Sequence, residues 1–209
     1  MREKIDCFLP CDDQMMAEQT VSQLRGSKTV QNIFLLVSEP LPVSDDGILA
    51  DCRQILVENL TGSNTLMSIA ENAKADFVLL ITRSSRLTLG KGALDRMLRV
   101  ATDSDATMVY ADHNERREEN GAWIVERHPS IDYFEGSIRD DFDFGSLWLV
   151  KTPLLHTFEM QAGEHDYQYA GLYALRLFLS RKGQIFHLNE TLYAEQETDL
   201  RASGVKQFD

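Results

Sequence analysis

The residues Phe77-Val78-Leu79-Leu80-Ile81 form an uninterrupted apolar stretch, and Asn32-Ile33-Phe34-Leu35-Leu36-Val37 has nearly the same character. Short apolar runs of this kind predict strands that are buried on both faces, as the strands of parallel sheets are. A third strand is predicted at Ile5-Asp6-Cys7-Phe8-Leu9, where Pro10 ends it. Parallel strands need long crossover connections, so we expect helices between them.

Helical periodicity appears in the segments that separate these strands. From Asp12 or Asp13 to Arg25, apolar residues recur at the three- and four-residue spacing of a helix face. Further helices are predicted at residues 66–73, 94–101 and 169–181, and further strands at residues 55–57, 107–110, 122–125, 147–150, 184–188 and 192–194. This order predicts an α/β fold with a mostly parallel central sheet and right-handed crossovers.

Length and composition are those of a globular protein. The chain has 209 residues, of which 43% are hydrophobic and 26% are charged, and these proportions exclude a disordered or fibrous protein. We expect a single domain over residues 1–197, because no linker or internal repeat interrupts the pattern. Residues 198–209 form a polar tail, which we interpret as a frayed end or as the start of a further segment of a longer protein.

The charge balance and the cysteines narrow the function classes. A formal net charge of -12 repels phosphate backbones, so the sequence disfavours a general nucleic-acid binder. The three cysteines, Cys7, Cys11 and Cys52, offer neither a zinc-ligand spacing nor a disulfide framework. No segment approaches the roughly 18 consecutive apolar residues of a membrane span. These features together predict a cytoplasmic location.

Candidate ligand-binding residues follow the ends of the predicted strands, because ligands of open parallel sheets bind at the carboxyl ends of the strands. These positions are residues 10–13, 38–39, 60–64, 82–86 and 111–113. Neither a P-loop nor a G-x-G-x-x-G turn stands among them, and the chain has no G-x-S-x-G elbow or H-E-x-x-H helix. The sequence therefore lacks the motifs of the common nucleotide-binding and hydrolase classes.

The order of these segments resembles that of family-2 glycosyltransferases with the GT-A fold. The segments that carry the resemblance are residues 5–24, 59–70, 75–81, 109–112, 143–151, 165–167 and 182–193, within residues 5–196. The resemblance implies a three-layer α/β/α fold with a mostly parallel central sheet. It also implies transfer of a sugar from a nucleotide donor, with a UDP-sugar favoured, to a hydroxyl of a glycan or lipid-linked acceptor. The setting it implies is bacterial surface polysaccharide or glycan biosynthesis, at the inner face of the membrane.

The same resemblance implies roles for particular residues. Asp166, with Glu164 as the nearby alternative, matches the carboxylate that takes the proton from the acceptor hydroxyl, and Asp166 equally suits a helix cap. Glu39 and Asp13 match the pocket for the nucleotide base, although both also suit ordinary loop acids and Asp12 also suits the cap of the first helix. The residues matched to the nucleotide-sugar site are Pro10, Asp13, Glu39, Gly62, Asn64, Thr82, Arg83, Ser84, Arg86 and Asp112.

The chain departs from the family at the metal site. The family's Asp-x-Asp motif holds Mg²⁺ or Mn²⁺ against the donor diphosphate. Here Thr82 and Ser84 stand at the matching positions, and Asp112 is the one carboxylate expected nearby. Hydroxyls are poor substitutes for two carboxylates, so we assign no metal ligands and doubt the metal. Arg83 and Arg86, with Lys91, either replace the cation on the phosphates or are solvated loop residues beside a decayed site.

Whether the chain is an enzyme therefore stays open. The alternative to a glycosyltransferase is a non-catalytic GT-A-fold module for binding or assembly within a larger protein, and the missing Asp-x-Asp favours it. A nucleotidyltransferase would need a glycine-rich, basic loop where Asp12-Asp13-Gln14 stands. Cys11 is predicted to be a buried, inert thiol. We assign no role to His113 or His187, because neither has a partner at metal-ligand spacing in the sequence.

Overall fold

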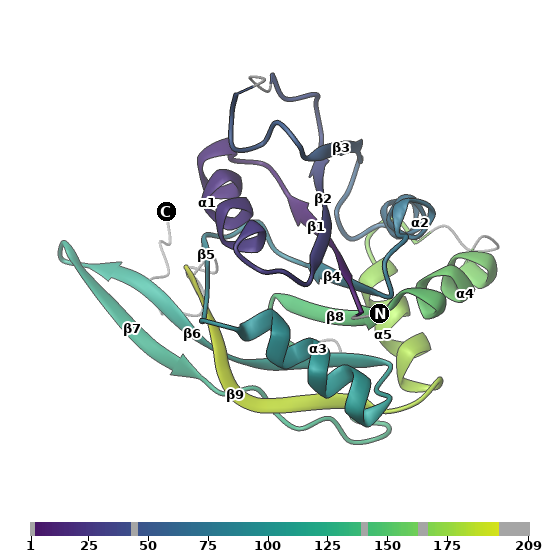
Figure 1. Ribbon diagram of the computed structural model, residues 1–209. Coiled ribbons are helices and arrows are strands. Elements are labelled where there is room, and N and C mark those ends of the chain that lie inside the picture. Colours follow the sequence, from purple (N-terminus) through teal and green to yellow (C-terminus); the bar gives the residue numbers. More distant parts are fainter. Residues whose placement is uncertain (1–2, 43–45, 139–141, 163–166, 197–209) are drawn as a thin grey trace, which may run out of the picture.

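The computed structural model describes residues 3–42, 46–138, 142–162 and 167–196, which are arranged around one nine-stranded sheet (Figure 1). The strand order is β3-β2-β1-β4-β8-β6-β9-β5, and β7 pairs with β6 outside this path. Within these ranges no helix has the length and apolar character needed to cross a membrane.

Four neighbouring strands run parallel, as the apolar sequences of three of them predict. They are β1 (Ile5–Pro10), β2 (Val30–Val37), β3 (Arg53–Leu56) and β4 (Phe77–Ile81). The helices α1 (Gln14–Arg25) and α2 (Ser63–Asn72) connect β1 to β2 and β3 to β4. Because β1 and β4 have neighbours on both sides and helices over both faces, all of their side chains are buried.

The other half of the sheet is mixed. β8 (Leu147–Lys151) is antiparallel to β4 and to β6 (Met108–Glu119). β6 runs parallel to β9 (Ile185–Gln196) and forms a hairpin with β7 (Ala122–His128) that extends away from the body of the molecule (Figure 1). The short strand β5 (Leu87–Leu89) is antiparallel to β9.

Helices cover both faces of the sheet, which confirms the predicted three-layer α/β/α architecture. On one face, α1 and α3 (Ala93–Ser104) pack on a core that includes Cys7. On the other, α2, α4 (Thr152–Ala162) and α5 (Gly171–Ser180) pack on a core that includes Phe8. Since successive side chains of a strand point to opposite faces, these two adjacent residues belong to different cores.

Several boundaries differ from the sequence prediction. α4 is not predicted, because Pro153 follows its first residue; a proline is tolerated there since the first amides of a helix have no partner within it. β5 has only three residues, too few to show a periodicity. The two strands predicted at residues 184–188 and 192–194 are one continuous strand, β9, and β6 continues to Glu119.

A glycine brings the starts of α2 and α5 together at the carboxyl edge of the parallel strands. The Gly171 amide donates to Thr61 O at 2.8 Å, and the Ser63 amide donates to Tyr167 O at 2.9 Å. A Cβ at Gly171 would lie 2.7 Å from both Ser63 N and Thr61 O, so the two backbones approach this closely only with glycine.

Candidate functional site

A cavity of about 330 Å³ opens at the carboxyl end of β4, the edge where ligands of such sheets bind. It is lined by Thr82, Arg83, Phe142, Asp143, Phe144, Gly145, Trp148, Leu172 and Arg176. A narrower apolar pocket shares Thr82 and Leu172 with it and reaches Pro10 at the end of β1. The two spaces are therefore adjacent and join the ends of β1 and β4.

Arg83 is held between two carboxylates at this cavity. Its Nη2 donates to Asp143 Oδ1 at 2.9 Å, and its Nη1 donates to Glu195 Oε1 at 3.2 Å. The Glu195 side chain is 4% exposed, whereas that of Arg83 is 40% exposed. Ser146 donates its hydroxyl to the other oxygen of Glu195, and the Gly145 amide donates to Asp143 at 2.8 Å. The guanidinium thus has a fixed position beside the cavity.

The pKa values of these groups follow from the pairing. Burial raises the pKa of Asp143 and of Glu195, but their neighbours outweigh burial and hold both pKa values below the ordinary range. The main lowering cause is the charge of Arg83 for Asp143, whereas for Glu195 the contacts with His113 and Ser146 lower the pKa more than Arg83 does. Burial lowers the pKa of Arg83, but the two carboxylates outweigh it and raise that pKa above its ordinary value. All three groups are therefore charged at neutral pH.

Arg176 is a second cation at the cavity. Its Nη1 donates to Phe142 O at 2.7 Å, and its guanidinium lies 5.2 Å from the centre of the Tyr173 ring. The rings of Phe144 and Trp148 lie 5.8 and 5.9 Å from it. Aromatic faces stabilise a cation in this arrangement. The cavity therefore combines two guanidinium groups with aromatic walls.

The structure separates the residues predicted for the nucleotide-sugar site. Pro10, Thr82 and Arg83 line the two adjacent cavities described above. Gly62 and Asn64 line a third cavity of about 240 Å³ at the start of α2. Asp13, Glu39, Ser84, Arg86 and Asp112 are not among the residues that line these three cavities. The proposed catalytic residues Glu164 and Asp166 lie outside the described residues.

Asp13 has a structural role as the cap of α1. Its carboxylate accepts a hydrogen bond from the Met16 amide at 3.0 Å, so the cap is Asp13 and not Asp12. We expect Asp13→Ala to lower the free energy of unfolding by about 1 kcal/mol, the usual cost of removing such a cap. Asp12→Ala is the matched control and is expected to change it little. Urea unfolding of both variants measures the difference, and equal stabilities would contradict the capping role.

Asp112 is buried in a network of its own. It accepts hydrogen bonds from the Ser130 amide at 2.8 Å and from Arg127 Nη2 at 3.3 Å, and His187 Nε2 lies 2.8 Å from it. Burial raises its pKa, but these partners outweigh burial and hold the pKa below the ordinary value. The carboxylates that contact Arg83 are Asp143 and Glu195, so the expectation that Asp112 is the one carboxylate near that position is wrong.

The residues at the Asp-x-Asp position do not fit the hard cation of the family. Thr82 and Ser84 offer hydroxyls, and Arg83 between them in sequence pairs with Asp143 and Glu195. Mg²⁺ and Mn²⁺ are normally bound by carboxylates. Neither motif position carries a carboxylate here, so we derive no catalytic step through a metal at this position.

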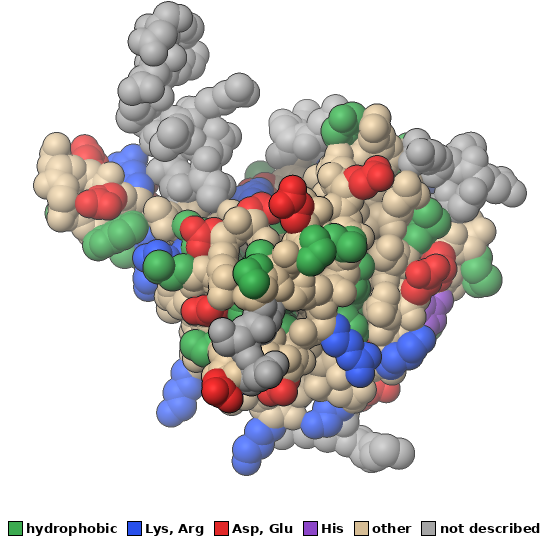
Figure 2. Space-filling view, turned by 90° about the horizontal axis from the view of Figure 1, so that it is seen from above, with side chains coloured by type: hydrophobic (Ala, Val, Ile, Leu, Met, Phe, Trp, Pro, Cys, Tyr) green, Lys and Arg blue, Asp and Glu red, His purple; other side chains and the backbone are tan. Residues whose placement is uncertain are grey.

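The remaining predictions concern Cys11 and the surface charge. Cys11 is buried, as predicted, and burial raises the pKa of its thiol to about 11. The inertness of this thiol stays a prediction, which the raised pKa favours. Among the side chains coloured by type in Figure 2, carboxylates and cations are interspersed over the face seen from above. That part of the surface has no broad basic patch of the kind that binds phosphate backbones.

Comparison with known proteins identifies the fold. No protein-family model and no curated protein matches the chain. The structure of S. aureus TarS 1-349 in complex with UDP-GlcNAc is similar, with a TM-score of 0.60 and 11% identity over 97% of this chain and 61% of that one. The structure of S. aureus TarS 1-349 has a TM-score of 0.59 and 12% identity, over 92% of this chain and 60% of that one.

A nucleotidyltransferase is also similar. The 4-diphosphocytidyl-2C-methyl-D-erythritol synthase of Anaerococcus prevotii has a TM-score of 0.56 and 10% identity over 90% of each chain. At such identities these likenesses show the fold alone. The chain has the GT-A-like fold of nucleotide-sugar and nucleotidyl transferases. It spans about three fifths of the length of the TarS structures, at 60% and 61%.

Proposed function

We propose that the chain is a glycosyltransferase domain that binds a nucleotide sugar, with a UDP-sugar favoured, and transfers the sugar to a hydroxyl acceptor. The observation that carries the proposal is the cavity at the carboxyl ends of β1 and β4, in a fold similar to that of TarS 1-349 in complex with UDP-GlcNAc. The proposed acceptor is a glycan or a lipid-linked molecule, in bacterial surface polysaccharide or glycan biosynthesis.

The chemistry of the cavity supports an anionic ligand. Arg83 and Arg176 supply two guanidinium groups, and guanidinium groups suit phosphate oxygens because they present several donors in one plane. Phe144 and Trp148 line the apolar side of the cavity, where their rings hold the guanidinium of Arg176. In this proposal the guanidinium groups stabilise the negative charge of the departing nucleotide diphosphate, as the metal does in the family.

The acceptor hydroxyl also needs a base. A carboxylate within hydrogen-bond reach would take its proton as the new glycosidic bond forms and the bond to the diphosphate breaks. Asp166, with Glu164 as the alternative, is our proposal for this base. Asp166 directly precedes Tyr167, whose carbonyl accepts a hydrogen bond from the Ser63 amide at the start of α2.

A non-catalytic binding module is the second candidate. Asp143 and Glu195 neutralise Arg83, and their negative charges oppose the approach of a diphosphate. The hydroxyls of Thr82 and Ser84 do not replace the missing carboxylates. This arrangement favours a domain that keeps the fold of a transferase while binding something other than a charged donor.

Calorimetric titration with UDP, GDP, UDP-GlcNAc and other sugar nucleotides, in EDTA and in Mn²⁺, separates the two candidates. For the enzyme we expect binding in EDTA that weakens about tenfold in Arg83→Ala, since a charge-assisted hydrogen bond contributes roughly 1.5 kcal/mol. Arg117→Ala is the control, because Arg117 pairs with Glu126 on the hairpin. Binding that requires Mn²⁺ would contradict the metal-free site, and no binding of any nucleotide would favour the non-catalytic module.

A further inference from the structure

Metal-ligating side chains gather on one face of the β6–β7 hairpin. His113 and Glu115 are two residues apart in β6, so their side chains point to the same face. His128 of β7 lies directly opposite His113. The two-residue turn Asn120-Gly121, in which both residues have positive φ, sets this register.

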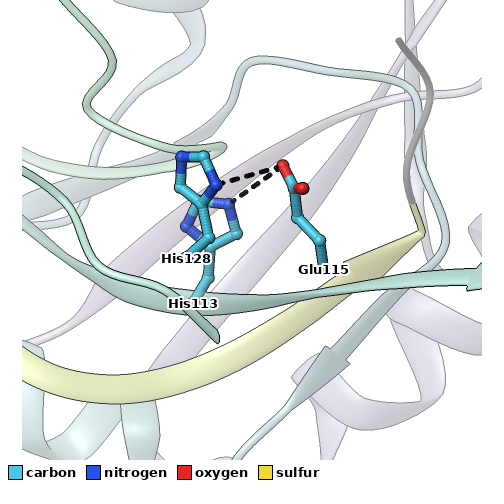
Figure 3. Close-up of side chains that lie close together, drawn as sticks. All are labelled: His113, Glu115 and His128. Carbon is cyan, nitrogen blue, oxygen red and sulfur yellow. Dashed lines mark ion pairs between the residues drawn. The ribbon is translucent and has the colours of Figure 1, made fainter. Parts of the chain in front are cut away.

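The three side chains converge on one point (Figure 3). His128 Nδ1 lies 3.5 Å from Glu115 Oε1, and His113 Nε2 lies 4.0 Å from the same oxygen. One ligand atom from each residue lies within 4.8 Å of the other two. The ligand atoms of a tetrahedral zinc site with bonds of about 2.1 Å lie about 3.4 Å apart. Small side-chain rotations would therefore bring these atoms to coordinating distance.

A fourth candidate ligand is Glu195 of the next strand, whose Oε1 also accepts a hydrogen bond from Arg83. Glu195 of β9 pairs with Glu115 of β6 and points to the same face. Its Oε1 lies 3.2 Å from His113 Nε2, close to the spacing expected between two ligands of one metal. The four side chains come from three adjacent strands, β7, β6 and β9.

His113 gives independent evidence that a ligand is expected here. Its side chain is fully buried, and in the described part of the chain neither ring nitrogen has a partner that meets hydrogen-bond geometry, although Glu195 Oε1 lies 3.2 Å from Nε2. Its ring is packed between His128 and Tyr193, with centroids 4.7 and 5.0 Å away. Leaving a buried polar group without a partner costs free energy. A metal ion at Nε2 would supply that partner.

The local charge also suits a divalent cation. Glu115 and Glu195 face the imidazoles, and Asp143 Oδ2 lies 3.9 Å from His128 Nε2. Arg83 is the cation paired with Asp143 and Glu195. With neutral imidazoles, the group therefore carries an excess of two negative charges, which one divalent ion would balance.

We propose that His113, Glu115 and His128, with Glu195 as the fourth ligand, bind one Zn²⁺ ion. Two imidazoles in the ligand set favour Zn²⁺ over Mg²⁺ or Mn²⁺, which prefer oxygen ligands. The ion fastens β7 to β6 and β9 at the base of the hairpin, so the site is structural. It does not depend on the proposed glycosyltransferase activity, and its ligands are different from the residues at the Asp-x-Asp position.

The test is calorimetric titration of the full chain with Zn²⁺ and optical titration with Co²⁺, both after removal of bound metal with EDTA and without nucleotide. We expect one Zn²⁺ per chain, a visible Co²⁺ spectrum of a tetrahedral site, and a rise in Tm. His128→Ala is expected to weaken Zn²⁺ binding at least about tenfold, the effect of losing one ligand. The His128 side chain is 42% exposed, so this variant is expected to fold.

Two control variants separate the site from adventitious binding. His156→Ala removes an imidazole from α4, where it contacts Ala70 O, and Glu126→Gln removes a negative charge from the exposed hairpin. Both are expected to bind Zn²⁺ as the wild type does. The proposal is overturned if the wild type binds Zn²⁺ no more tightly than His128→Ala, or if His156→Ala loses as much affinity. Because no nucleotide is present, neither result bears on the proposed transferase.

Discussion

Asp112→Ala is expected to lower the free energy of unfolding by about 3 kcal/mol, because it removes a buried carboxylate on which three donors converge. The Asp112 side chain is fully buried, and it contacts the Ser130 amide, Arg127 and His187. The variant leaves the amide and the imidazole without that acceptor in a place where water does not replace it. Urea unfolding at pH 7 measures the loss.

Asp132→Ala is the matched control for this prediction. Asp132 contacts the other ring nitrogen of His187, at 2.5 Å, but its side chain is 64% exposed. Water replaces an exposed carboxylate readily, so we expect a loss below about 1 kcal/mol. Similar losses in the two variants would mean that burial of Asp112 contributes little, and would contradict the account of this network.

The parallel half of the fold is predictable because burial leaves a simple signal. β1, β2 and β4 are enclosed by neighbouring strands and helices, so their sequences are largely apolar, and that of β4 is apolar without interruption. The outer parts of β6 and β9 are different, because cross-strand charged pairs such as Glu115 with Glu126 replace apolar residues there. A polar strand of this kind does not show the apolar alternation from which strands are recognised.

The cavity residues are less predictable than the fold. Contacts such as that between Arg83 and Glu195 depend on how the polar outer parts of β6 and β9 are paired, which the sequence pattern does not reveal. Glu195 lies just beyond the strand predicted at residues 192–194, and Arg83 reaches it across 112 positions of sequence. One signal was available in the sequence for the histidines. An Asn-Gly turn at residues 120–121 makes residues equidistant from it cross-strand partners, which places His128 opposite His113.

Arg83→Met is expected to destabilise the protein by about 2 kcal/mol at pH 7 and by much less at pH 3. Removing the guanidinium leaves Glu195, which is 4% exposed, and Asp143 without their cation. Breaking a fully buried pair costs roughly 3–5 kcal/mol, and the smaller value expected here allows for the solvent that screens the 40% exposed Arg83.

The sign of the pH dependence follows from the carboxylates. Their pKa values are lower in the folded protein than the ordinary values of about 3.9 for Asp and 4.3 for Glu in an unfolded chain. The stabilisation is therefore fully present above the ordinary pKa values and is lost as the pH falls through the lowered ones. Arg83→Met removes the main cause of the lowering for Asp143 and a smaller one for Glu195, so the stability difference between wild type and variant should shrink as the carboxylates become protonated.

Urea unfolding of wild type and Arg83→Met at pH 7, 5 and 3 measures this difference, and Arg117→Met is the matched control. Arg117 also pairs with two carboxylates, Glu119 and Glu126, but their side chains are 54% and 58% exposed. We expect that control to cost less than about 1 kcal/mol. A loss of stability in Arg83→Met that stays constant from pH 7 to pH 3 would show that Arg83 stabilises the protein through packing and not through its ion pairs. The cavity would then lack the fixed cation that the proposed metal-free binding of a diphosphate requires.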